Sequence, residues 1–208
     1  MFDKIIEWDR ELFLSINSFH SPFFDEMMKL FSARAPWIPL YLIIAASLFF
    51  SVRINLRAKD KPFISIHKKD TKFAVIAFIG IIVAFGLSDF LSNQTKYLVE
   101  RLRPGWDPLT VHIARVLEAN RNSFSFVSSH ATNVFGFATI TSLIFRKRWY
   151  TSFIFFWAIL VCYSRIYVGR HFPGDVLGGA LLGFIFGYLL YCLVCYFYKR
   201  FPSKSIVK

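Results

Sequence analysis

The polar residues of this chain are confined to short segments between long apolar runs, and this separation limits the folds available to it. Of the 208 residues, 55% are hydrophobic, and 26 are Phe. The apolar residues fall in blocks and not in the one-sided stripes of helices in soluble proteins. Blocks of this kind predict helices that cross a bilayer. The sequence therefore predicts an all-α, polytopic transmembrane bundle formed by one domain over residues 1–208.

We expect five membrane helices within residues 37–198, formed by the runs 37–52, 73–91, 131–145, 149–163 and 176–198. Several runs are shorter than the about 20 residues of a full crossing, so their ends must extend into the flanking polar segments. Residues 1–34 carry two amphipathic helices, which we expect in the membrane interface or against the bundle. An alternative is that residues 2–19 or 22–33 form a sixth, shallow crossing.

Lysine and arginine gather in three segments of the chain: 53–72, 146–148 and 199–208. With five spans these segments share one side of the membrane, which the positive-inside rule places in the cytoplasm. The N-terminal helices then lie on the opposite face, together with Arg101, Arg103 and the loop 104–128. Cations on that outer face break the rule, and an anionic substrate is one reason for them. The net charge of +12 does not indicate nucleic-acid binding, because no soluble fold presents a basic surface.

Lys96 and Arg103 form the first polar cluster at the end of an apolar run. They are seven residues apart, nearly two helical turns, so we expect both on one helix face. Pro104 disfavours helix at Arg103 and indicates a helix end there. Arg can hold two phosphate oxygens at once, and Lys adds a point charge. The alternative for this pair is that both side chains reach for the membrane interface.

Ser128, Ser129 and His130 form the second cluster, immediately before the third apolar run. A serine at a helix start caps the helix, and the free backbone N–H groups there attract anions. A histidine at this point can donate a proton to a departing oxygen. The alternative is an ordinary helix cap beside a passive histidine.

Arg165, His171 and Asp175 form the third cluster, between the fourth and fifth runs. Asp175 follows His171 by about one helical turn, so its carboxylate can accept a hydrogen bond from one imidazole nitrogen. That contact orients the ring and makes the other nitrogen a better nucleophile. Asp89 and Glu100 lie nearby in the sequence, and we expect them to be unpaired. No carboxylate cluster indicates a metal site.

The ordered set Lys96-x6-Arg103-Pro104, Ser128-x-His130 and Ser164-Arg165-x5-His171-x3-Asp175 resembles the type 2 phosphatidic acid phosphatase (PAP2) superfamily, which includes vanadium haloperoxidases. The second motif departs from the family's Pro-Ser-Gly-His, because Val127 and Ser129 replace Pro and Gly. Serine in place of glycine matters where the backbone needs a positive φ.

The resemblance implies a role for each matched residue. His171 would attack phosphorus and form a phospho-histidine, Asp175 would orient it, and His130 would protonate the departing oxygen. Phosphate oxygens would be bound by Lys96, Arg103, Ser128, Ser129 and Arg165. The family needs no metal and no other cofactor for this chemistry.

We therefore expect a lipid phosphatase of a bacterial inner membrane, with its active site facing the periplasm or the outside. Its partners would be membrane lipids and a lipid phosphate substrate. The candidate substrates are undecaprenyl diphosphate, phosphatidylglycerol phosphate, phosphatidate and lipid A phosphates. Competing hypotheses are a transport or binding protein for phospholipid head groups and a related scaffold without turnover. The sequence indicates neither the lipid nor the oligomeric state.

Overall fold

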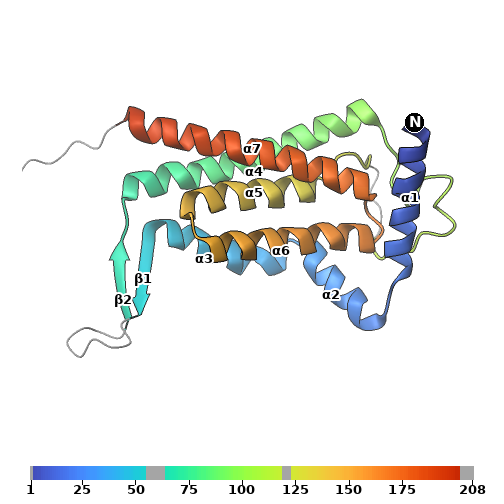
Figure 1. Cartoon of the computed structure of the whole chain (residues 1–208), viewed down its shortest axis with the longest axis horizontal. Coiled ribbons are helices and arrows are strands. Elements are labelled where there is room, and N and C mark those ends of the chain that lie inside the picture. Colours follow the sequence, from blue (N-terminus) through green and yellow to red (C-terminus); the bar gives the residue numbers. More distant parts are fainter. Residues whose placement is uncertain (1, 55–63, 119–122, 202–208) are drawn as a thin grey trace, which may run out of the picture.

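The computed structural model describes residues 2–54, 64–118 and 123–201, which form helices and one small hairpin (Figure 1). The N-terminal elements are α1 (Phe2–Ser18), α2 (Pro22–Ser32), the 3₁₀ turn η1 (Ala35–Trp37) and α3 (Ile38–Phe49). Strands β1 (Phe50–Ile54) and β2 (Ile64–Lys68) follow. The remaining helices are α4 (Thr71–Val99), α5 (Ser129–Phe145), α6 (Arg148–Tyr167) and α7 (Pro173–Arg200).

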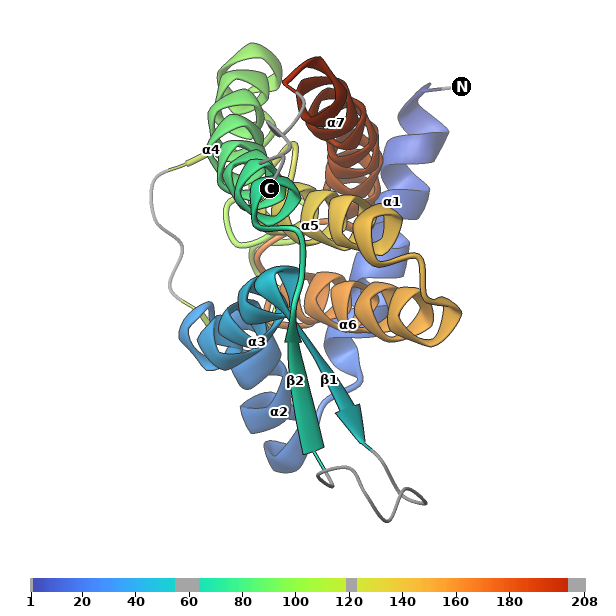
Figure 2. The same cartoon turned by 90° about the vertical axis from the view of Figure 1, so that its left-hand side faces the viewer.

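Helix α5 is the centre of the bundle. It packs against α4, α6 and α7, and the view along the bundle places it between α4 and α7 on one side and α6 on the other (Figure 2). Most residues of its first four turns are buried. This burial explains why a membrane helix is dotted with Thr, Ser and Asn, since it faces protein and not lipid.

Within the described residues, α4, α6 and α7 are long and apolar enough to cross a membrane. Helix α2 and the η1–α3 segment meet the same test together, as a pair bent by 67°. Helix α5 has 17 residues, slightly fewer than the about 20 of a full crossing. The prediction of a multi-pass, all-α membrane protein is confirmed. We expected helix α2 in the interface or in a shallow crossing. In the structure it is the first half of a bent pair whose second half is η1 and α3.

The predicted first span, residues 37–52, is wrong at its C-terminal end. Helix α3 stops at Phe49, and β1 begins at the next residue and pairs antiparallel with β2. Residues 50–54 alternate apolar and polar, a period of two that suits a strand and not a helix.

Segments that are far apart in the sequence meet at each end of the bundle (Figure 1). The β-hairpin, the α5–α6 turn and the C-terminal end of α7 lie at one end, and the segment after α4 and the α6–α7 turn lie at the other. Helix α1 lies across this second end. The polar motifs therefore lie at the opposite end from the basic residues 146–148 and from Lys199 and Arg200, as the loop charges predict. Residues 55–63 and 202–208 of the basic segments lie outside the described residues.

A seam of small residues lets α5 and α7 approach closely. Gly179, Gly183 and Gly187 follow one another at four-residue intervals on α7 and face α5. A Cβ atom added at Gly183 would lie 2.3 Å from the carbonyl oxygen of Thr132 and 2.9 Å from the backbone nitrogen of Gly136. Backbones in contact at this distance leave no room for a side chain, which is the packing expected of small residues between membrane helices.

We predict that Gly183→Ala lowers the thermal stability of the detergent-solubilised protein, because the new methyl group must push α5 and α7 apart. Overpacking of this kind costs about 1–3 kcal/mol. Gly86→Ala is the matched control, since a Cβ there meets nothing within 4 Å. Equal melting temperatures for the two variants would contradict the close α5–α7 contact.

Candidate active site

A cavity of about 350 Å³ lies where α4, α5, α6 and the α6–α7 turn meet. Six of the eight predicted site residues line it: Lys96, Arg103, Ser129, His130, Arg165 and His171. The other two, Ser128 and Asp175, lie directly behind the wall, where the Ser128 backbone N–H donates to the Asp175 carbonyl at 3.0 Å. The fold thus brings all three sequence motifs to one place.

The expectation that Lys96 and Arg103 share one helix face is wrong. Helix α4 ends at Val99, and Glu100 follows in the left-handed conformation with φ 50°. The chain then turns back, so Arg103 reaches the cavity from a loop. Its Nη1 atom donates to the Arg170 carbonyl at 2.8 Å and lies 3.3 Å from Nε2 of His171. Burial lowers the pKa of Arg103 to about 10, so the guanidinium remains charged at neutral pH.

His171 lies between a cation on one side and a carboxylate on the other. Its Nδ1 atom is 3.6 Å from Oδ2 of Asp175, and its Nε2 atom faces Arg103. Burial lowers the pKa of His171 to about 3, against the opposing effect of Asp175. The ring is therefore neutral above about pH 4, with Nδ1 toward the carboxylate and Nε2 toward the cavity.

The Asp175 carboxylate is fully buried and surrounded by donors. Asp175 lies in the first turn of α7, which begins at Pro173. Its Oδ2 atom accepts a hydrogen bond from the Phe172 backbone N–H at 2.8 Å. Oδ2 also accepts from the Ser125 hydroxyl, which lies 3.4 Å from Nδ1 of His171. Sequence reasoning missed Ser125, since its position in an irregular segment carries no periodic signal.

Arg101 connects Asp175 to α1. Its Nη1 atom donates to Oδ1 of Asp175 at 2.9 Å, and its Nη2 atom donates to Asp9 at 2.6 Å. The guanidinium also lies over the Phe172 ring, 4.3 Å from its centre. Asp9 in turn accepts from the Gly174 backbone N–H at 2.6 Å. An anionic substrate is thus not needed to explain this outer-face arginine, because two carboxylates of the protein already pair with it.

The two serines before His130 do different things. Ser128 is the N-cap of α5, and its hydroxyl accepts from the backbone N–H three residues on. The Ser129 hydroxyl accepts from Lys96 Nζ at 2.6 Å and from the Ser92 hydroxyl at 2.7 Å. Ser129 is not among the described residues with positive φ, so the backbone there accepts a side chain without strain.

Arg165 enters the cavity from the last turn of α6 and is almost completely buried. Its Nη1 atom bonds the backbone carbonyl and the hydroxyl of Ser32, and lies 3.3 Å from Oε2 of Glu118. Its Nε atom has no hydrogen-bond partner within the described ranges. The Nη1 edge of the guanidinium is thus held in place by the protein.

Four further residues line the cavity: Arg34, Asp89, Asn93 and Arg170. Asp89 accepts from the side chain of Asn133 at 2.7 Å, so the expectation that it is unpaired is wrong. Helical spacing from Lys96 back to Asn93 and Asp89 could have identified those two. No group of three or more potential metal ligands occurs among the described residues, and the absence of a metal requirement stays a prediction.

The model of the PAP2 superfamily matches residues 73–199. A lipid A 4'-phosphatase of Bacteroides thetaiotaomicron is 31% identical over 210 aligned positions that cover 100% of this chain and 86% of that protein. A lipid A 4'-phosphatase of Porphyromonas gingivalis is 32% identical and covers 98% and 80%. A solved PAP2-type phosphatidylglycerolphosphate phosphatase of Bacillus subtilis superposes with a TM-score of 0.63 at 24% identity, covering 97% of this chain and 89% of that one.

We predict that Arg101→Ala destabilises the protein, because it removes a charged donor from a carboxylate that has no access to water. Breaking one partner of a buried pair costs about 3–5 kcal/mol, and the partial exposure of Arg101 lowers this to about 2–3 kcal/mol. Lys29→Ala removes one partner of the exposed Lys29–Glu26 pair and should change stability by less than about 1 kcal/mol. Thermal unfolding of both variants in detergent tests this, and an unchanged Arg101→Ala variant would contradict it.

Proposed function

The chain belongs to the PAP2 superfamily and is a membrane lipid phosphatase, and we propose that its substrate is the 4'-phosphate monoester of lipid A. The observation that carries this proposal is the extent of the similarity to the two lipid A 4'-phosphatases. It covers nearly the whole chain, including α1 and α2, and not the motif region alone. Both helices pack at the site end of the bundle, where the head group of the substrate would lie.

In the proposed mechanism, Nε2 of His171 attacks the phosphorus atom. The neutral ring supports this role, as does the carboxylate beside Nδ1, which stabilises the positive charge that the ring gains. A bond forms between Nε2 and phosphorus while the bond from phosphorus to the sugar oxygen breaks. The departing oxygen takes a proton from His130, which lines the same cavity.

A water molecule then attacks the phospho-histidine in the second half of the reaction. His130, now without its proton, accepts one from this water, and the bond between Nε2 and phosphorus breaks. Inorganic phosphate leaves, and both histidines return to their starting forms. No step needs an oxidant, a reductant or a second substrate other than water.

Fixed cations would hold the phosphoryl group throughout. Lys96, Arg103 and Arg165 all line the cavity that contains the two histidines. Their positions are set by protein contacts before any ligand binds, so little reorganisation is needed as charge develops on the equatorial oxygens. The Ser129 hydroxyl would contribute by holding Lys96 in position for the phosphate. Ser128 would contribute indirectly, by capping the start of α5.

The competing hypothesis of a head-group carrier explains the cations and not the histidine pair. A binding protein needs positive charge, but it gains nothing from a neutral His171 oriented by a buried carboxylate. That arrangement is costly to maintain, and strongly perturbed groups of this kind gather at catalytic sites. We therefore favour turnover.

We predict that purified protein releases phosphate from lipid A 4'-phosphate faster than from phosphatidate, phosphatidylglycerol phosphate or undecaprenyl diphosphate. His171→Ala should lower this rate by at least about 10⁴-fold, because the covalent step has no other nucleophile. His112→Ala, which changes an exposed loop histidine, should leave the rate unchanged. Full activity in the His171→Ala variant would contradict the mechanism, and lipid phosphate binding without turnover by the wild type would favour the carrier.

The proposed location is the inner membrane, with the cavity facing the periplasm. Arg146, Lys147 and Arg148 lie at the end of the bundle opposite the cavity, and positive segments of this kind remain cytoplasmic. We predict that His112→Cys reacts with an impermeant thiol reagent added to spheroplasts, whereas Lys147→Cys does not. Both positions are exposed. The reverse labelling would place the cavity in the cytoplasm.

A further inference from the structure

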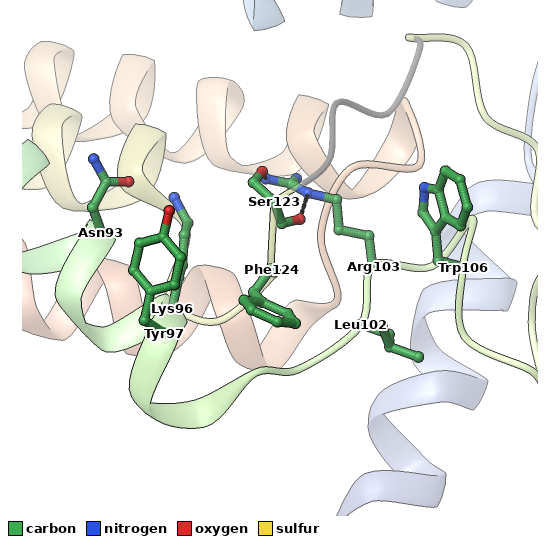
Figure 3. Close-up of a pocket in the computed structure, with 8 residues that line it drawn as sticks. All are labelled: Asn93, Lys96, Tyr97, Leu102, Arg103, Trp106, Ser123 and Phe124. Carbon is green, nitrogen blue, oxygen red and sulfur yellow. Dashed lines mark hydrogen bonds between the residues drawn. The ribbon is translucent and has the colours of Figure 1, made fainter.

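A second cavity of about 320 Å³ adjoins the first one at the end of α4 (Figure 3). The two cavities share three residues: Asn93, Lys96 and Arg103. The other walls of this second cavity are mostly apolar. They come from α4 and from residues 102–106 and 123–124, which lie between α4 and α5 in the sequence. We call this second cavity the aromatic groove, because Tyr97, Phe124 and Trp106 lie along it (Figure 3).

The shared wall limits what the aromatic groove can hold. A phosphoryl group placed beside Lys96 and Arg103 would bring its ester oxygen, or a neighbouring atom, to the opening between the two cavities. The occupant of the groove must therefore be the part of the substrate that is joined directly to the phosphate. A volume of about 320 Å³ is at the lower end of the range for small-molecule sites.

The lining of the aromatic groove is amphipathic. Tyr97 and Trp106 expose 71% and 57% of their surface, and Phe124 packs edge-on against Tyr97. Beside these rings, the Ser123 hydroxyl accepts from Arg103 at 2.8 Å (Figure 3). The Asn93 side chain makes no hydrogen bond within the part of the chain that the structure describes.

An alkyl chain could cover the aromatic rings of this lining, but it would offer no hydrogen bond to the Asn93 side chain or the Ser123 hydroxyl. The molecule offers a comparison in the groove between α4 and α7, whose described walls are entirely apolar and include Ile79, Val83 and Leu193. Trp106 lies seven residues beyond the end of α4. The aromatic groove thus extends past the helix, toward the depth of lipid head groups and not of their tails.

We propose that the aromatic groove binds the pyranose ring that carries the scissile phosphate. The C–H faces of a sugar stack on exposed aromatic rings, while its hydroxyl and amino groups bond to Asn93 and Ser123. This inference rests on the proposed function, since lipid A carries its 4'-phosphate directly on a glucosamine ring. The groove would select phosphorylated sugars over lipid phosphates in which the phosphate joins a glycerol or a prenyl chain.

Calorimetric titration of the full-length protein in detergent tests the proposal. The probe is glucosamine 4-sulfate, whose ester the enzyme should not cleave, and inorganic sulfate is its sugar-free counterpart. We expect the sugar ester to bind about tenfold more tightly than sulfate. Trp106→Ala should lower the affinity for the sugar ester about tenfold, which is the contribution expected of one good aromatic contact. The same variant should bind sulfate within about twofold of the wild type.

Control variants separate this role from a structural one. Trp149→Ala removes a similarly exposed ring on α6 at the other end of the bundle and should change neither affinity. Trp106→Phe should retain most of the sugar affinity, because it keeps an aromatic face. Tyr97→Ala supplies an independent test if Trp106→Ala does not fold.

Each contrary result has a distinct meaning. If sulfate binds but the sugar adds nothing, or if Trp106→Ala and Tyr97→Ala weaken both ligands equally, the sugar site is overturned. Octyl sulfate that binds more tightly than glucosamine 4-sulfate, and loses that advantage in Trp106→Ala, would assign the groove to an alkyl chain and also overturn it. Failure of sulfate itself to bind would instead contradict the anion cavity on which the proposed function depends.

Discussion

The burial of the Asp175 carboxylate is the constraint on which the site end of the molecule depends. A carboxylate removed from water keeps its charge only where donors surround it. Those donors come from three connecting segments: Arg101 after α4, Ser125 before α5 and the backbone of Phe172 before α7. One buried charge therefore fixes the ends of three helices, and with them the ring of His171.

Two cations of the cavity, Lys96 and Arg103, have no carboxylate partner among the described residues, whereas Arg165 is paired with Glu118. The hydrogen-bond partners of Arg103 are carbonyl and hydroxyl oxygens and an imidazole, none of which is an anion. Lys96 is held by a serine hydroxyl. Like charges confined in a poorly polarisable interior repel one another, so an anion that enters relieves this repulsion.

The sequence identified the residues that meet at the cavity better than the geometry in which they meet. Lys96, His130, Arg165 and His171 could be identified because each follows or precedes an apolar run, at a spacing that the family shares. Their partners could not be predicted. Arg101 and Ser125 reach Asp175, and Asp9 reaches Arg101, through contacts between distant segments, which leave no local pattern. The strands at residues 50–54 and 64–68 were missed for a related reason. Five alternating residues that directly follow an apolar run are easily read as the end of its helix until the pairing strand is known.

Helix α1 precedes α4 and α7 in the chain and is synthesised before them, yet its polar anchors are made only later. Asp9 contacts Arg101 and Gly174, which are 92 and 165 positions further along the chain. Until α7 has been inserted, α1 has no complete docking place and Asp175 lacks its surroundings. Assembly of the contacts around Asp175 is thus tied to the insertion of α7, so that a chain truncated before α7 would lack the carboxylate beside His171.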